Sequence, residues 1–331
     1  MDDRTYFAGC LIGQCLGDAL GFAMEGRGAD ECRRYVEERM DARCADPRGC
    51  TPFGFGQYTD DSQLARELMQ SYVARAGFEP QDYAERIAAI FRENRIVGRG
   101  QATELAARRL DNGFPWDAAG TPSPSAGNGS AMRAGPIGLM FPDGSAALIR
   151  AAHDQGRITH QDPRCSAGAV AIAGSVAMAL RHEPVDPRAW LEELAGWVAP
   201  LDAGFAGHLA SLKAWLELPP EAAAASISRC GMQPDGRGWE GITPFVVGSV
   251  LWSLYSFLRT PDDYWETIRT AIAVGGDVDT TAAMAGAISG AYVGLDGIPA
   301  HLAERLTDRR TWGLAELVEL ADRCFDVRRA L

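Results

Sequence analysis

This chain of 331 residues has almost no lysine: of its 32 basic residues, only Lys213 is a lysine. Acidic residues outnumber basic ones by 44 to 32, and the formal net charge is −12. Binding to nucleic acid or to an anionic membrane surface needs basic patches. The charge balance therefore argues against a general nucleic-acid-binding or membrane-surface protein, but not against one small phosphate-binding pocket. We attribute the scarcity of lysine to a bias in genomic composition.

The eight cysteines form no C-x-x-C pair, and none has a zinc-like spacing to histidine. We interpret them as free, mostly buried thiols in a reducing compartment. The first residues, MDDRTYFAGC, lack the basic region and the long apolar stretch of a signal peptide. No stretch is long and apolar enough to span a bilayer. We therefore expect a soluble, cytoplasmic protein.

The sequence also lacks a sustained alternation of apolar and polar residues and any internal repeat. Helical periodicity dominates instead: Leu64, Leu68 and Tyr72 share one face of an amphipathic helix. The pattern predicts helices over residues 62–75, 81–93, 101–110, 165–180, 245–258, 262–273, 280–293 and 312–327. A strand pair is an alternative for residues 245–258, and residues 165–180 are small and apolar on all sides.

Connections rich in glycine and proline separate these segments at residues 46–57, 112–129, 231–244 and 294–299. No linker divides two compositions, and 47% of the residues are hydrophobic, which suffices for a large core. We therefore predict an all-α fold with a single domain over residues 1–331.

Two stretches place paired acids beside a hydroxyl at the start of a predicted helix: Thr59-Asp60-Asp61 and Asp277-Val278-Asp279-Thr280. Each stretch alone fits simple helix capping. Together they offer oxygen ligands that suit Mg²⁺, Mn²⁺ or Ca²⁺ and suit zinc poorly. Four unpaired carboxylates in one interior site would be costly without cations. We predict that the two stretches meet and hold a pair of divalent ions.

Three further stretches each allow two interpretations. Residues 127–133 (GNGSAMR) fit a phosphate cradle of backbone N–H groups, or a plain turn into a helix. His160 precedes the helix predicted at 165–180 and fits a cap or core partner as well as a catalytic group. Glu25 follows a glycine-rich first helix and, taken alone, is a solvated charge at a helix end.

These stretches occur in one order along the chain, and in that order the sequence resembles the ADP-ribosylglycohydrolase family from Gly9 to about Gly294. The most specific stretches are GDALGFAME (17–25), YTDDS (58–62), GNGSAMR (127–133), THQDP (159–163) and GGDVDTTAAMAGAISGA (275–291). The resemblance implies a compact, orthogonal multi-helix fold with two Mg²⁺ or Mn²⁺ ions in a central cleft. It further implies a hydrolase that removes ADP-ribose from a modified acceptor, with ADP-ribosylarginine on a protein as the first expectation.

Carried over residue by residue, the resemblance assigns metal ligation to Thr59, Asp60, Asp61, Asp277, Asp279 and Thr280. It places Glu25 at the cleft mouth, where Glu25 or Asp61 would take a proton from the attacking water. It assigns the ribose and diphosphate of the substrate to Gly127, Asn128, Gly129, Ser130 and Met132, with His160 lining the same pocket. Residues 239–244 (WEGITP) and the loop 112–126 depart from the family pattern, which puts the acceptor side in doubt.

Two other functions fit part of the pattern. A non-catalytic ADP-ribose-binding relative would be expected to have lost a ligand, whereas all six candidates and Glu25 are present. A metal-dependent nucleotide pyrophosphatase or phosphatase fits the metal stretches alone, but GNGSAMR and THQDP argue against it. The expected partner is an ADP-ribosylated protein or an ADP-ribosyl small molecule, and a monomer is the working expectation. The sequence leaves open the acceptor linkage, the target, an immunity or housekeeping role, and Mg²⁺ against Mn²⁺.

Overall fold

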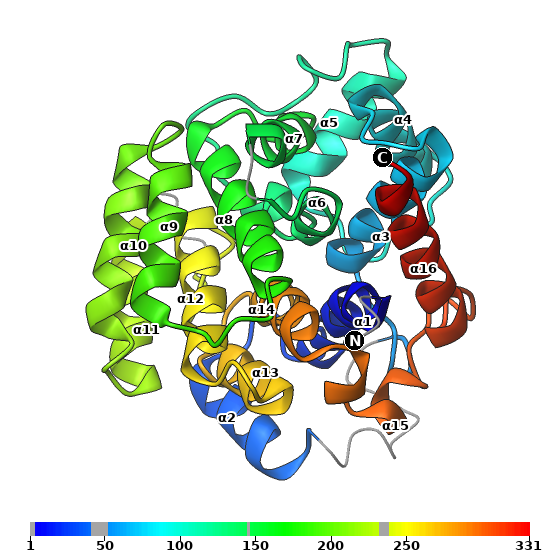
Figure 1. The fold of residues 1–331 in the computed structure, drawn as a ribbon. Coiled ribbons are helices and arrows are strands. Elements are labelled where there is room, and N and C mark those ends of the chain that lie inside the picture. Colours follow the sequence, from blue (N-terminus) through cyan, green and yellow to red (C-terminus); the bar gives the residue numbers. More distant parts are fainter. Residues whose placement is uncertain (1–3, 41–51, 144–145, 232–237) are drawn as a thin grey trace.

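A computed structural model describes residues 4–40, 52–143, 146–231 and 238–331 (Figure 1). Within these ranges the chain is helical, and the backbone pairs outside the helices are isolated bridges rather than a sheet. One hydrophobic core includes residues from the first helix to the last. The predicted all-α fold with a single compact body is confirmed, while the extension of the domain over all of residues 1–331 stays a prediction.

The α-helices, in chain order, are α1 (Arg4–Gly21), α2 (Ala29–Glu38), α3 (Asp60–Arg75), α4 (Pro80–Arg92), α5 (Gln101–Asp111), α6 (Gly135–Met140), α7 (Ala146–Arg157), α8 (Pro163–Ala179), α9 (Pro187–Val198), α10 (Ala203–Trp215), α11 (Pro220–Ser228), α12 (Val246–Arg259), α13 (Tyr264–Ala273), α14 (Val278–Val293), α15 (Ala300–Ala303) and α16 (Leu314–Ala330). Short 3₁₀ turns are η2 (Asn128–Ser130), η3 (Arg229–Gly231) and η4 (Leu295–Gly297). None of the helices in the described part of the chain combines the length and apolar character needed to cross a membrane.

At the centre of the molecule, α1 and α14 pack against each other in opposite directions (Figure 1). A Cβ atom on Gly9 would lie 2.2 Å from the carbonyl oxygen of Gly290, and one on Gly13 would lie 2.4 Å from that of Gly286. Only glycine permits such contact between helix backbones. Because the helices are antiparallel, the end of α1 meets the start of α14, and a Cβ on Gly21 would lie 2.5 Å from the Cα of Asp279.

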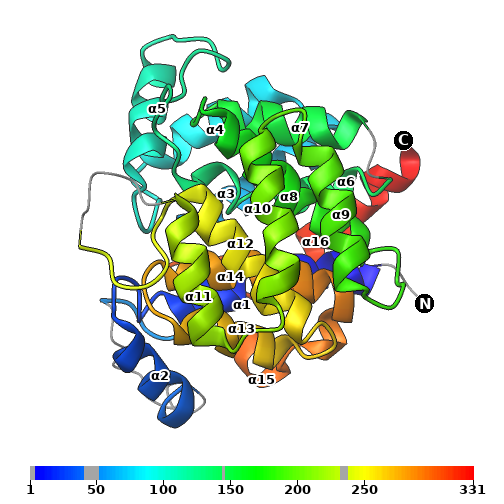
Figure 2. The same ribbon diagram turned by 90° about the vertical axis from the view of Figure 1, so that its left-hand side faces the viewer.

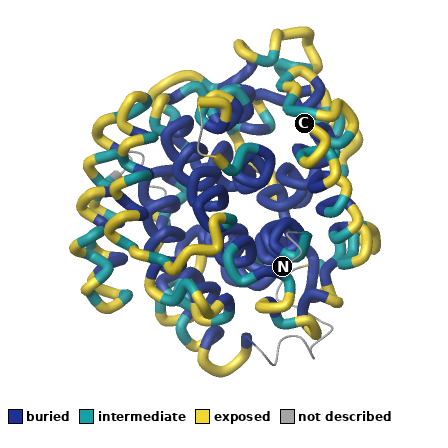
Figure 3. The backbone as a smooth tube through the Cα atoms, in the orientation of Figure 1, coloured by how far each residue is buried: buried dark blue, intermediate teal, exposed yellow. Residues whose placement is uncertain are grey.

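The other helices surround this pair, and burial decreases from the centre of the molecule towards its periphery. The chain is buried along most of α8, α12 and α14 and exposed at the periphery (Figure 3). Helices α9, α10 and α11 form an outer layer that packs on α8 and α12 (Figure 2). The described ends of α1, α3, α5 and α14 converge on one region, where the predicted site residues lie.

Each predicted helix begins and ends within three residues of an observed one. The strand alternative for residues 245–258 is wrong, because this segment forms α12. The prediction omitted several helices, including α11, whose sequence PEAAAASIS lacks a clear apolar stripe because alanine covers most faces. The predicted connection at 112–129 is irregular up to η2, and parts of the connections at 46–57 and 231–244 lie outside the described residues.

Candidate active site

A cavity of about 630 Å³ lies where these helix ends converge. One side is lined by the acidic and hydroxyl residues Glu25, Thr59, Asp60, Asp61, Asp277, Asp279 and Thr280. The other side includes Gly127, Asn128, Gly129, Met132 and His160. The structure therefore brings both acidic stretches to one cavity, where the Thr280 side chain lowers the pKa of both Asp61 and Asp277.

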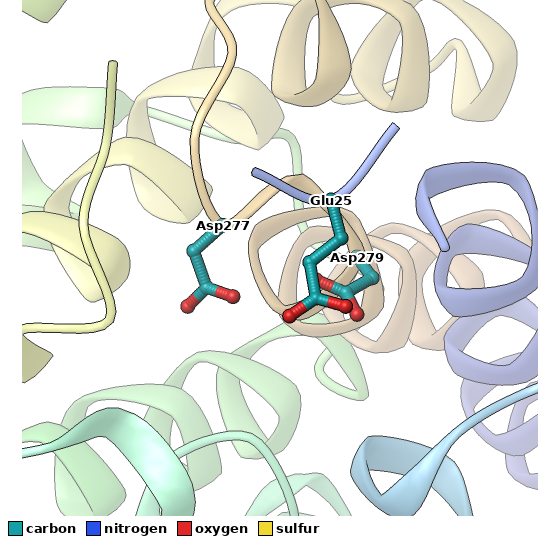
Figure 4. Close-up of side chains that lie close together, drawn as sticks. All are labelled: Glu25, Asp277 and Asp279. Carbon is teal, nitrogen blue, oxygen red and sulfur yellow. The ribbon is translucent and has the colours of Figure 1, made fainter. Parts of the chain in front are cut away.

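Three carboxylates lie close together: Glu25, Asp277 and Asp279 (Figure 4). One oxygen from each lies within 4.8 Å of the others. Their side chains come from the turn after α1 and from the start of α14, and they point into the same open space (Figure 4). Glu25 is thus placed as a further candidate metal ligand, a role that the sequence did not assign to it.

The turn that carries Glu25 is held by backbone bonds to the glycine pair before α14. The N–H of Gly26 donates to Gly276 O (2.8 Å), and the N–H of Gly276 donates to Arg27 O (2.9 Å). Gly276 has a φ of +94°, and a Cβ there would lie 2.0 Å from Ile242 O. The close approach at this glycine is made to the protein's own backbone, and it fixes Glu25 beside α14.

Simple helix capping does not account for the two acidic stretches. Thr59 and Asp277 occupy the N-cap positions of α3 and α14, but neither side chain accepts a capping hydrogen bond. Instead, Thr59 Oγ1 lies 3.0 Å from an oxygen of Asp18 and 3.0 Å from Asp61 Oδ2. The side chains at these helix starts are therefore available to the cavity.

Asp18 is a buried acid that the sequence analysis did not single out. Its carboxylate accepts hydrogen bonds from the backbone N–H and the hydroxyl of both Thr59 and Ser62. Burial and the nearby Asp61 raise the pKa of Asp18, while the hydrogen bonds from the Ser62 hydroxyl and from the N–H and hydroxyl of Thr59 oppose the rise. Asp18 orients the start of α3, and the signal for it in the sequence was an acid inside a largely apolar helix.

Burial raises the pKa of every acid in the cluster. The pKa of Asp61 rises to about 6 and that of Asp277 to about 7, in both cases because of burial first. Burial and neighbouring carboxylates raise the pKa of Asp60 and Asp279 well above the usual range. The cluster thus resists full ionisation unless positive charge is added.

One buried oxygen shows where such a charge is needed. Asp61 Oδ1 is inaccessible to solvent and has no hydrogen-bond partner among the described residues. A buried carboxylate oxygen without a donor is costly, and a cation relieves that cost. Carboxylates and hydroxyls are the ligands that hard divalent cations take. The residues present therefore fit divalent metal ions.

Only some residues of the glycine-rich loop, residues 127–133, line the cavity as the sequence predicted. Asn128 Nδ2 donates to Asp277 Oδ2 and to Ser249 Oγ, so this amide nitrogen positions the acidic cluster. The Ser130 hydroxyl donates to Cys165 O (2.9 Å), is fully buried and does not line the cavity. A Cβ on Gly129 would lie 2.6 Å from His160 Cε1, which explains the glycine. The contacts of this loop with substrate stay a prediction. Because the Ser130 hydroxyl is already bonded to Cys165 O, Ser130 could contact a substrate only through its backbone.

The cavity also includes residues that the sequence did not point to, at the start of α5 and before α12: Gly98, Arg99, Gly100, Thr103 and Phe245. Trp239 and Thr243, from the stretch 239–244 that the sequence linked to the acceptor side, line the cavity as well. The segment before α5 is tied to the acidic helix, because the N–H of Asp60 donates to Val97 O (2.7 Å) and the N–H of Val97 donates to Gln63 Oε1 (2.8 Å). The glycines on both sides of Arg99 were the available sequence signal.

Comparison with known proteins shows which family has this sequence and fold. Residues 1–330 match the ADP-ribosylglycohydrolase family. The ADP-ribosylhydrolase ARH3 of Bos taurus is 30% identical over 321 residues, which cover 88% of this chain and 86% of the relative. The ADP-ribosylarginine hydrolase Tri1 of Pseudomonas putida (strain GB-1) is 25% identical over 330 residues, which cover 96% of this chain and 77% of the relative.

A solved structure described as an ADP-ribosylglycohydrolase-related protein complex superposes with a TM-score of 0.74 at 27% sequence identity. The match covers 99% of this chain and 100% of the other. The fold, the sequence match and the acidic cavity lead to the same conclusion: this chain belongs to the ADP-ribosylglycohydrolase family, hydrolases that act on the glycosidic bonds of ADP-ribose.

Proposed function

We propose that this protein removes ADP-ribose from modified arginine side chains of proteins and that it uses two divalent cations, Mg²⁺ or Mn²⁺. The observation that supports this proposal most strongly is the cluster of carboxylates in one cavity, with a buried oxygen of Asp61 that has no hydrogen-bond partner in the described part of the chain. The free thiols of the described cysteines, most of them buried, are compatible with a reducing compartment, and we propose the cytoplasm as the location.

The ligands of the proposed ions are the residues that line the acidic side: Thr59, Asp60, Asp61, Asp277, Asp279 and Thr280. Glu25 is close enough to Asp277 and Asp279 to share an ion with them. When bound, the ions would supply positive charge that offsets the clustered carboxylates and would help to activate water and to orient the substrate's oxygens.

Within the chain itself, Glu25 is the candidate that takes the proton from the attacking water. It lines the cavity, yet it is more exposed than the aspartates around it, so it can pass a proton on to solvent. Partial burial raises its pKa, which brings a carboxylate closer to the range of an effective general base. Asp61 is the alternative base, but its Oδ2 already interacts with Thr59.

The opposite wall would hold the ADP-ribose. The backbone of Gly127 to Gly129 and the ring of His160 line this wall together with Met132. This arrangement would set the anomeric carbon of the distal ribose beside the acidic cluster, and fixed alignment of reactants supplies a large part of enzymatic rate enhancement. An arginine acceptor carries a guanidinium charge, which the carboxylates at the mouth would attract.

The experiment measures free ADP-ribose released from an arginine-linked and a serine-linked substrate, each with Mg²⁺, Mn²⁺ or EDTA. The proposal predicts cation-dependent release from the arginine-linked substrate and loss of release in Asp60→Ala and Asp279→Ala, with an unchanged circular dichroism spectrum. Release from the serine-linked substrate alone would replace the proposed acceptor. Formation of AMP or phosphate would favour a pyrophosphatase or phosphatase, and binding of ADP-ribose without turnover would favour a binding protein.

A further inference from the structure

The buried cation of Arg133 is linked to His160, a residue that lines the cavity, through the hydroxyl of Thr159. Arg133 is fully buried, and its Nη2 donates to Thr159 Oγ1 (2.7 Å) and to Gln155 O (3.0 Å). Thr159 Oγ1 lies 2.8 Å from His160 Nδ1. Arginine is always a donor, so the Thr159 oxygen accepts from Arg133, and its own hydrogen must go elsewhere.

Among the residues that the structure describes, the Thr159 hydrogen has two acceptors within reach, and only one of them has a lone pair left. The carbonyl oxygen of Gly156 lies 3.5 Å from Thr159 Oγ1, but it already accepts the backbone N–H groups of Thr159 (3.2 Å) and His160 (3.0 Å). A carbonyl oxygen has two lone pairs, and both are used here. His160 Nδ1 is nearer and has no such competition, so the hydroxyl donates to Nδ1.

This direction of donation fixes the tautomer of the ring. A nitrogen that accepts a hydrogen bond carries no proton, so a neutral His160 must hold its proton on Nε2. The Nε2 edge faces the glycine-rich loop: a Cβ on Gly127 would lie 3.4 Å from Nε2, and one on Gly129 would lie 3.2 Å from it. Both glycines line the cavity.

The charge state of the ring agrees with this geometry. Burial, and then the charge of Arg133, lower the pKa of His160 to about 3. Burial, together with the neighbouring cation, therefore keeps the imidazole neutral at the pH of the cell.

We infer that Arg133, acting through Thr159, holds His160 as a neutral ring with its only N–H on Nε2, directed to the bound ligand. His160 then donates one hydrogen bond and accepts none from the ligand, so it selects an oxygen that can accept, such as a phosphate or ether oxygen. Arg133 and Thr159 are positioning residues for this contact. The identification of the ligand as ADP-ribose rests on the proposed function, whereas the tautomer does not.

The test has a spectroscopic part that needs no ligand. The protein with ¹⁵N-labelled histidine is examined by two-bond ¹H–¹⁵N correlation near pH 7, and His160→Gln identifies the His160 signals among those of the five histidines. We expect an unprotonated Nδ1 and a protonated Nε2. Thr159→Val should move the Nδ1 resonance, because it removes the donor, and Thr159→Ser should leave it in place. A proton on Nδ1 in the wild type, or an unchanged Nδ1 resonance in Thr159→Val, would contradict the inference.

The second part measures the affinity for ADP-ribose by calorimetry on the same proteins. Loss of one net hydrogen bond corresponds to about a fivefold change in affinity, so Thr159→Val should bind about fivefold more weakly and Thr159→Ser within twofold of the wild type. Equal affinities for the valine and serine variants would contradict the positioning role. Because the tautomer is read in the free protein, a failure of ADP-ribose release in the wild type would bear on the proposed function alone.

Discussion

Asp18 and Thr59 are joined by a pair of hydrogen bonds: the backbone N–H and the hydroxyl of Thr59 each lie 3.0 Å from the Asp18 carboxylate. This contact links the interior of α1 to the first residue of the acidic stretch before α3. When the Thr59 hydroxyl donates to Asp18, the lone pairs on its oxygen are left for a cation. Outer groups that orient ligands in this way tune metal affinity.

The first prediction concerns this contact. Asp18→Asn replaces an acceptor with an amide that faces donors, so the free energy of unfolding should fall by about 2 kcal/mol. The affinity for Mn²⁺ should fall by about tenfold or more, since Thr59 loses its orienting acceptor. Calorimetric titration with Mn²⁺ measures this. Ser62→Ala is the control: it removes another donor to Asp18 (2.7 Å) but leaves Thr59 in place, so it should cost stability and spare Mn²⁺ affinity.

The second prediction concerns the acidic cluster itself. In the wild type, Mn²⁺ in place of EDTA should raise the thermal unfolding midpoint, because a ligand at about a hundred times its dissociation constant stabilises the folded state by about 2.7 kcal/mol. Asp279→Asn should lose this rise. Without metal, the same variant should be no less stable than the wild type, because it removes one repelling charge. Asp296→Asn, an exposed change in η4, should respond to Mn²⁺ like the wild type. An equal rise in Asp279→Asn would place the metal elsewhere.

The third prediction tests the crossing of α1 and α14. Gly13→Ala would place a Cβ 2.4 Å from the carbonyl oxygen of Gly286, which should cost about 1–3 kcal/mol of unfolding free energy. It should also lower turnover, since the crossing sets Glu25 beside Asp279. Gly207→Ala is the matched control, because nothing lies within 4 Å of its Cβ and this exposed helical position gains about 0.5–1 kcal/mol. Urea unfolding compares the two, and equal stabilities would contradict the close packing.

The fourth prediction is a pH dependence of stability. The pKa of folded His160 is lowered to about 3, whereas an unfolded histidine titrates near 6.5. Between these values the unfolded chain binds more protons, so stability is present above pH 6.5 and falls as the pH is lowered. The loss approaches about 1.4 kcal/mol per pH unit once the pH is well below 6.5.

His160→Gln should not show this contribution. The stability of the variant relative to the wild type, measured by urea unfolding, should therefore rise by about 1 kcal/mol from pH 6.5 to pH 5.5. A difference that does not change with pH would show that the folded ring is protonated as readily as the unfolded one.

Much of the fold could be predicted because its helices are periodic and their ends are chemically marked. Leu64, Leu68 and Tyr72 are all buried in α3, on the face that their spacing predicted. The crossing of α1 and α14 could not be predicted, because the glycines that permit it are compatible with many partners. Which glycine-containing helices pack against each other depends on the shapes of their backbone surfaces, and a single sequence does not show these shapes.

Part of the site could also be predicted from the sequence, because its acids stand at the starts of helices. Acids before a helix are conspicuous, and Asp60, Asp61, Asp277 and Asp279 do line one cavity. Hydroxyls and amides are less informative, because their partners decide their roles. Ser130 bonds to the Cys165 carbonyl and Asn128 to Asp277, and neither contact has a signature in sequence. Asp18 was missed because its four donors come from a distant turn.

The central claim is cation-dependent release of ADP-ribose, and the most direct measurement is product analysis after incubation with arginine-linked ADP-ribosyl protein. With Mg²⁺ or Mn²⁺ we expect free ADP-ribose, and with EDTA or in Asp279→Ala we expect none. Release that persists in EDTA and in Asp279→Ala, or AMP as the product, would contradict the account.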